Sequence, residues 1–117
     1  MKPRRLTQSV VRRLALDLPE VVESAHFERP DFRVRNKIFA TLPPDRGVVI
    51  LKSLPVNVDA LVSSDSGTFW NEWRGRWVGI RLDRVTLPLL RELIADAWRV
   101  AAPKRLAATL KQSPPAV

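Results

Sequence analysis

The chain has no cysteine and only one histidine among its 117 residues. The lack of cysteine excludes disulfide bonds and thiolate chemistry. A single histidine with scattered carboxylates is poor spacing for a transition-metal site. Glycine is scarce as well, and the four glycines form neither a P-loop nor a GxGxxG pattern, which argues against nucleotide-cofactor chemistry. We therefore predict no cofactor, no metal site and no catalytic residues, and we expect the protein not to be an enzyme.

Long apolar segments are absent too. No run approaches the ~20 residues that a transmembrane helix needs, and no apolar segment of a signal peptide follows residues 1–5. We expect a soluble cytoplasmic protein with no membrane partner. The length and the 45% hydrophobic content fit one globular domain. We place this domain at residues 1–111 and a flexible tail at residues 112–117, where Pro114 and Pro115 cannot continue a helix.

Acidic residues are outnumbered by basic ones, with 12 Asp and Glu against 20 Lys and Arg and a net charge of +8. The excess is greatest at the two ends of the chain, since no acid precedes Asp17 and none follows Asp96. A basic domain attracts polyanions, and nucleic acid is the commonest polyanion in a cytoplasm. The alternative is that these residues only solvate the surface.

Helical periodicity appears in three places. Apolar residues every four positions predict a first helix over residues 7–16. The clearest pattern begins at Thr86, a good N-cap. Its apolar stripe consists of Leu90, Leu93, Ile94, Ala97, Trp98 and Ala101. A shorter helix follows Pro55, with Asn57 as its candidate N-cap.

Residues 21–51 predict a β-meander. Residues 31–35 alternate apolar and charged side chains, as half-buried strands do, and residues 38–42 form the return strand after a turn at Asn36-Lys37. In this register one face of the hairpin is apolar and holds Phe32, Val34 and Phe39. The opposite face holds Arg33, Arg35, Ile38 and Ala40.

Residues 76–82 alternate in the same way and predict another strand before the last helix. The expected element order is therefore helix, three or four strands, helix, strand, helix. This order predicts an α+β fold in which helices pack on one face of a single antiparallel sheet.

Residues 26–40, HFERPDFRVRNKIFA, resemble the central segment of the MmcQ/YjbR family, which has a His-Phe pair, then Pro and Phe-Arg-Val, then Lys-Ile-Phe-Ala. The later Trp-Val strand and the terminal helix ending in Ala-Pro-Lys-Arg resemble the family too, so the likeness covers residues 6–110. The resemblance implies a two-layer fold with a curved antiparallel sheet. It also implies DNA binding, by analogy with a double-wing arrangement. The family's usual residues are replaced at Glu28, Asp31 and Asn36, and the two added acids weaken phosphate contacts there.

Basic residues gather on two predicted hairpins, where they would contact a phosphate backbone. The first group is Arg33, Arg35 and Lys37. The second group is Arg74, Arg76 and Arg81, with Arg84 in the same cluster, Trp77 to stack on a base, and Trp70 and Trp73 nearby. These groups favour a small, basic, non-enzymatic module that binds nucleic acid, and DNA in particular. The alternatives are that the first group pairs with nearby acids and that the tryptophans pack in the core or are half-buried.

Two other functions stay open. A protein-interaction or chaperone-like adaptor would use the outer sheet face with Ile38, Ala40 and Trp77. Whatever its function, we expect the protein to be a monomer or weak dimer. An enzyme or small-ligand binder would need a pocket lined by His26, Glu23 and Lys52. As a base or metal ligand, His26 would pair with Glu23 or Glu28. We expect instead that it packs structurally beside Phe27.

Overall fold

The computed structural model describes residues 6–45 and 47–110, so the predicted tail at residues 112–117 and both ends of the predicted domain lie outside the described residues. The elements in chain order are α1 (Gln8–Leu16), β1 (Val21–His26), β2 (Arg29–Val34), β3 (Lys37–Thr41), β4 (Val48–Lys52), α2 (Pro55–Ser64), β5 (Phe69–Glu72), β6 (Trp77–Arg81), α3 (Leu87–Ala101) and α4 (Lys104–Ala107). The predicted order is confirmed, except that β5 and the short α4 are added to it. No described helix is both long and apolar enough to cross a membrane.

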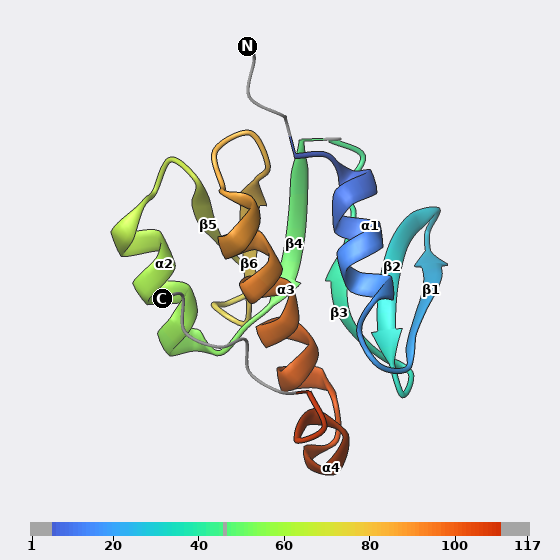
Figure 1. Cartoon of the computed structure of the whole chain (residues 1–117). Helices are drawn as coiled ribbons and strands as arrows, with labels where there is room; N and C mark the ends of the chain where they lie inside the picture. Colours follow the sequence, from blue (N-terminus) through green and yellow to red (C-terminus); the bar gives the residue numbers. More distant parts are fainter. Residues whose placement is uncertain (1–5, 46, 111–117) are drawn as a thin grey trace.

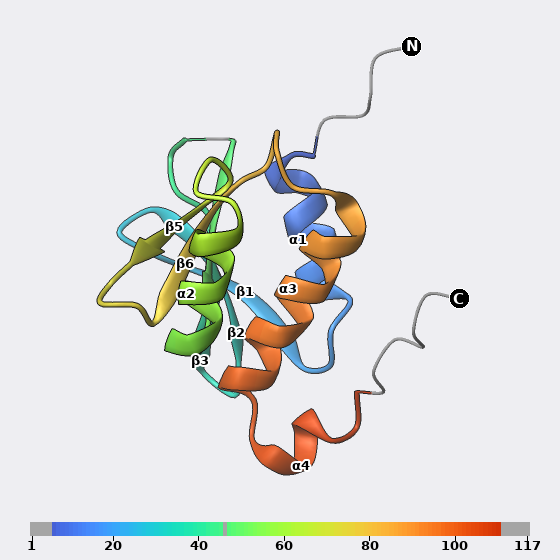
Figure 2. The same cartoon turned by 90° about the vertical axis from the view of Figure 1, so that its left-hand side faces the viewer.

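The six strands form one antiparallel sheet in the order β1-β2-β3-β4-β6-β5. The long helix α3 packs on the central strands β3 and β4, while α1 contacts β1 and α2 contacts β5. Figure 1 shows these three helices on the near side of the sheet, and Figure 2 shows the same arrangement from the side. The predicted α+β fold, with helices on one face of a single antiparallel sheet, is confirmed. We call the opposite face of the sheet the outer face.

Capping residues and one apolar stripe fix the two helices that cover the sheet centre. The side-chain oxygens of Thr7 and Thr86 accept hydrogen bonds from backbone N–H groups in the first turns of α1 and α3. The Nε1 of Trp98 donates to the backbone oxygen of Pro19 at 3.0 Å, which joins α3 to the segment that follows α1. The buried residues of α3 are Leu90, Ile94, Ala97, Trp98 and Ala101. The predicted stripe is therefore the contact surface of this helix.

The start of α2 differs from the prediction. Its N-cap is Leu54, which makes no side-chain capping bond, and Pro55 is the first helical residue. Proline suits that position because its fixed φ is already helical and its missing N–H would have no partner there. Asn57 lies within the first turn instead of capping it, so that prediction was wrong.

The turn between β2 and β3 comes one residue earlier than predicted. Arg35 and Asn36 have φ angles of 49° and 66° and form the two-residue turn, so Lys37 already belongs to β3. Positive φ at both central residues is the signature of the turn type that joins antiparallel strands most tightly. Arg35 therefore projects from the end of the hairpin. The prediction that it shares the sheet face of Arg33 was wrong.

A β-bulge changes which side chains of β3 face the core. Phe32 pairs with Ala40, but Arg33 pairs with Ile38, which leaves Phe39 as the extra residue. As a result Phe39 and Ala40 are both completely buried in the core. The predicted burial of Phe32 and Phe39 is confirmed, and the prediction that Ala40 lies on the outer face was wrong.

The strand β4 is buried on both of its faces, although helices cover only one. Its outer-face residues Val48 and Ile50 are 6% and 5% exposed. Ile50 pairs with Gly79 of β6, and a Cβ at Gly79 would stand only 2.0 Å from the ring of Trp70. Glycine therefore lets the indole lie directly on the sheet, and this side chain shields the centre of the outer face.

Candidate functional site

Basic, aromatic and aliphatic side chains share the outer face. Side chains alternate along a strand, and the pairing register aligns them across the sheet. The outer positions, from β1 to β5, are Val22, Ser24, His26, Arg29, Asp31, Arg33, Ile38, Thr41, Val48, Ile50, Lys52, Trp77, Gly79, Arg81, Trp70 and Glu72. Three of the predicted site residues, Arg33, Trp77 and Arg81, lie on this face.

Two hairpins, β1–β2 and β5–β6, extend away from α1 and α3; both point to the left in Figure 2. A cleft of about 770 Å³ is lined by residues from the tips of both hairpins and from the loop between β3 and β4. We call it the hairpin cleft. Its lining includes His26, Phe27, Arg29, Pro43, Pro44 and Trp73. Segments from distant parts of the sequence therefore meet at one concave site.

The β5–β6 hairpin brings together four of the predicted site residues, which are Arg74, Arg76, Trp77 and Arg81. Its three arginines are exposed. The rings of Trp73 and Trp77 meet edge to face at 5.3 Å between centroids. Cations lie over two of the rings, Lys52 at 6.0 Å from Trp77 and Arg81 at 5.6 Å from Trp70. The result is a surface of alternating cationic and aromatic groups.

The tryptophans of this hairpin are neither fully buried nor free on the surface. Trp70 and Trp77 are half-buried against the outer face, and the Nε1 of Trp70 donates to a carboxylate oxygen of Glu72 at 2.7 Å. Trp73, at the turn, is 52% exposed. The alternative of core or half-buried packing therefore holds for Trp70 and Trp77, and it does not hold for Trp73.

A buried carboxylate holds Arg33 on the outer face. Asp31 is completely buried and accepts two hydrogen bonds from Arg33, at 2.8 and 3.1 Å, and its Oδ2 lies 2.7 Å from Nδ1 of His26. Burial alone would raise the pKa of Asp31, but the bonds from Arg33 and His26 outweigh it and lower the pKa below its ordinary value. Arg33 is thus an internal counter-ion, as the acid-pairing alternative predicted.

The rest of the first predicted group lies at the β2–β3 turn and does not line the hairpin cleft. Arg35 makes a two-pronged salt bridge to Glu20, at 2.6 and 3.0 Å, and this hydrogen bonding lowers the pKa of Glu20. Lys37 is exposed beside it. The structure therefore separates the two predicted groups, with Arg74, Arg76 and Arg81 on one hairpin and Arg35 and Lys37 on another.

The sequence pattern missed two residues at the β1–β2 tip. Phe27 is 100% exposed and Arg29 lines the hairpin cleft beside it. The His-Phe pair indicated only a packed histidine, but a large aromatic residue between two strands was the available signal. His26 does meet the ring of Phe27 edge to face at 6.3 Å. The carboxylate partner of His26 is Asp31, and not Glu23 or Glu28, the two partners considered from the sequence.

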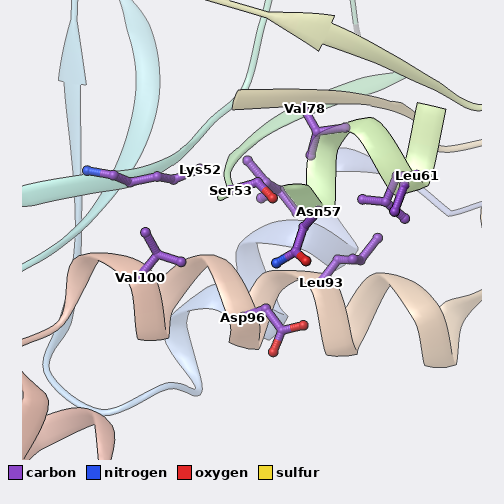
Figure 3. A pocket seen from close by; sticks show the side chains of 10 residues that line it. Lys52, Ser53, Asn57, Leu61, Val78, Leu93, Asp96 and Val100 are labelled. Carbon is purple, nitrogen blue, oxygen red and sulfur yellow. The ribbon is translucent and has the colours of Figure 1, made fainter. Parts of the chain in front are cut away.

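A second cavity, of about 230 Å³, lies between α2 and α3. Figure 3 shows the side chains around it, with Asn57 pointing toward α3 and Asp96 on the far side of the groove. Its other labelled residues are Lys52, Ser53, Leu61, Val78, Leu93 and Val100. Lys52 and His26 thus line different cavities, while Glu23 pairs with Arg12 of α1. The pocket needed for an enzyme or small-ligand site is not assembled from these residues, and the described residues contain no cluster of three metal-binding side chains.

Comparison with known proteins identifies the fold and the family. No curated protein matches this chain. The crystal structure of Deinococcus radiodurans protein DR2400, which carries a domain described as DUF419, aligns with a TM-score of 0.73 over 86% of this chain and 81% of that chain. At 20% identity this likeness establishes a shared fold. The family model described as YjbR matches residues 16–100, a span that contains both hairpins and most of the cleft lining. The chain therefore belongs to the YjbR family, as the resemblance of residues 26–40 predicted.

Proposed function

We propose that this protein is a small, non-enzymatic, cytoplasmic module that binds nucleic acid, and DNA in particular, through the β5–β6 hairpin and the outer face of its sheet. The observation that carries the proposal is the β5–β6 hairpin, on which Arg74, Arg76 and Arg81 are exposed beside half-buried tryptophans. Arginine supplies several donors to phosphate oxygens, and aromatic rings stack on bases.

The charge available on the β5–β6 hairpin and the outer face is positive. Asp31 is already occupied by Arg33 and His26, and Glu72 accepts from Trp70. Among residues 6–45 and 47–110, the salt bridges involve none of the three hairpin arginines. These guanidinium groups are therefore ready to neutralise phosphates, and releasing counterions from a nucleic acid is the main source of such affinity.

The test is a titration of fluorescently labelled DNA, followed by anisotropy at several salt concentrations. Replacing Arg74, Arg76 and Arg81 together by Ala should weaken binding and flatten the log–log salt dependence by about 0.9 for each lost duplex contact. A matched control removes three exposed arginines of the helical layer, Arg13, Arg91 and Arg105, and so changes net charge equally. Equal losses in the two triple variants would mean that net charge alone attracts DNA, and would refute a site on the hairpin.

A second candidate, a protein-interaction adaptor, is favoured by one observation. Val22 on the outer face of β1 is 62% exposed, and Phe27 at the tip of the same hairpin is fully exposed. Ile38 and Trp77 remain available to such a partner, but Ala40 does not, because it is buried. Affinity capture after nuclease treatment separates the two candidates: partners that vanish with nuclease argue against the adaptor.

A further inference from the structure

We infer that the hairpin cleft takes unpaired nucleobases, so that the protein binds single-stranded nucleic acid in preference to duplex. This inference rests on the proposed function and specifies its ligand. It assigns base-stacking roles to Phe27 and Trp73, the aromatic residues at the two hairpin tips. The proposed function gave neither residue a role in DNA binding.

The first support is the exposure of these two rings. Phe27 is 100% exposed and Trp73 is 52% exposed, and both line the hairpin cleft. Large aromatic side chains are normally buried, because they carry more apolar surface than other residues. Two of them, on opposite hairpins and facing one cleft, make a stacking platform that every base can use, because every base has an aromatic face.

The second support is the backbone at the same two positions. Phe27 has a φ of 48° and Trp73 a φ of 46°, in the left-handed region that glycine and asparagine occupy at low cost. The next residue in each turn, Glu28 or Arg74, has positive φ as well. The β2–β3 turn has the same paired positive φ at Arg35 and Asn36, so what sets the two cleft tips apart is that each places an aromatic residue in a turn that accommodates its bulk only with strain. Phe27 is fully exposed, so burial of its ring does not account for an aromatic residue at this turn.

The third support is the charge at the two hairpin tips, where Arg29 and Arg74 stand against one carboxylate, that of Glu28, which also lines the cleft. Arg29 lines the cleft at one tip, and Arg74 follows Trp73 at the other. Between them, His26 is held in place through Nδ1 by the buried Asp31. Phosphates on both sides of a stacked base would therefore meet a guanidinium group. Bases inside a duplex cannot reach these rings without being unstacked, which is why the single strand is preferred.

The experiment compares a labelled single strand of about twelve nucleotides with its duplex at physiological salt, since binding sites of this kind span ~4–16 nucleotides. Phe27→Asn and Trp73→Asn remove each ring while placing a residue that tolerates positive φ. We expect each variant to weaken single-strand binding about tenfold, with little change for duplex. Val56→Ala, at an apolar position on α2 that is 69% exposed, between the values of Trp73 and Phe27, is the control and should change neither.

The asparagine variants also separate loss of function from loss of folding. Because they relieve backbone strain, their melting temperatures should equal or exceed that of the unaltered protein. Equal binding of single strand and duplex, or unchanged single-strand binding in both variants, would overturn the inference. The proposed function would survive that result if the arginine triple variant still lost duplex binding, and it would fail if the unaltered protein bound neither form.

Discussion

Replacing Gly79 by Ala tests how the β5–β6 hairpin is attached to the sheet. A Cβ at this position would stand 2.0, 2.3 and 2.5 Å from three atoms of the Trp70 ring. Carbon atoms pack at about 3.5 Å, so the indole has to move outward by about 1.5 Å. That movement would disturb both the bond from Trp70 to Glu72 and the contact with Arg81.

The expected cost follows from three effects. Overpacking of this kind costs about 1–3 kcal/mol, and a weakened hydrogen bond adds about 0.5–1 kcal/mol. Replacing glycine in a strand gives back about 0.5–1 kcal/mol. Gly79→Ala should therefore lower the free energy of unfolding by about 2 kcal/mol, which moves the urea midpoint down by about 1 M.

Two further variants make the measurement specific. Gly47→Ala is the control, because the nearest atom to its Cβ is Asp45 Oδ1 at 3.5 Å, an ordinary contact, and it should change stability by less than about 0.5 kcal/mol. Trp70→Ala removes the ring itself, so adding Gly79→Ala to it should cost nothing more. If the two losses simply add, or if Gly79→Ala is as stable as the original chain, the close packing of Trp70 on Gly79 is refuted.

Two other predictions concern the charged groups of β2 and the turn that follows it. Asp31→Asn should cost about 2 kcal/mol at pH 7, because it removes a charged acceptor from Arg33 and His26. Since the folded-state pKa of Asp31 is lowered, its carboxylate stabilises the fold at pH values above the unfolded-state pKa of about 4. This stabilisation is lost as the pH falls through the folded-state pKa. The free energy of unfolding, measured with urea at pH 7 and in acid, should therefore fall less between the two pH values in Asp31→Asn than in the original chain. An equal fall in the two proteins would contradict this. Arg35→Ala should change stability by less than about 1 kcal/mol and leave DNA affinity nearly unaltered, because its pair with Glu20 is exposed and outside the cleft; a large loss of affinity would return Arg35 to the site.

Local patterns predicted the parts of this fold that depend on neighbours in sequence. The N-cap Thr86 and the stripe on α3 follow from helical spacing alone, and the burial of Phe32 follows from strand alternation. The grouping of Arg74, Arg76 and Arg81 was equally accessible, because one hairpin carries all three.

Features set by the curvature of the sheet were not predictable in this way. Alternation assigned Asp31 to an exposed face, but the structure buries it and supplies hydrogen-bond partners from its own strand and from β1. The bulge that turns Ala40 inward leaves no mark in the pattern of residue types. The juxtaposition of Phe27 and Trp73 requires two hairpins at opposite edges of the sheet to line one cleft, so no local rule reveals it.

The indole N–H signals of the four tryptophans offer the most direct test of nucleic-acid binding at the outer face. Trp70, Trp73 and Trp77 belong to the β5–β6 hairpin, whereas Trp98 is completely buried in α3 and bonded to the backbone of Pro19. Adding single-stranded DNA to isotope-labelled protein at physiological salt should shift the signals of Trp73 and Trp77 strongly and leave that of Trp98 in place. Shifts confined to residues of the helical layer, or no shifts at all, would contradict a nucleic-acid site on this face.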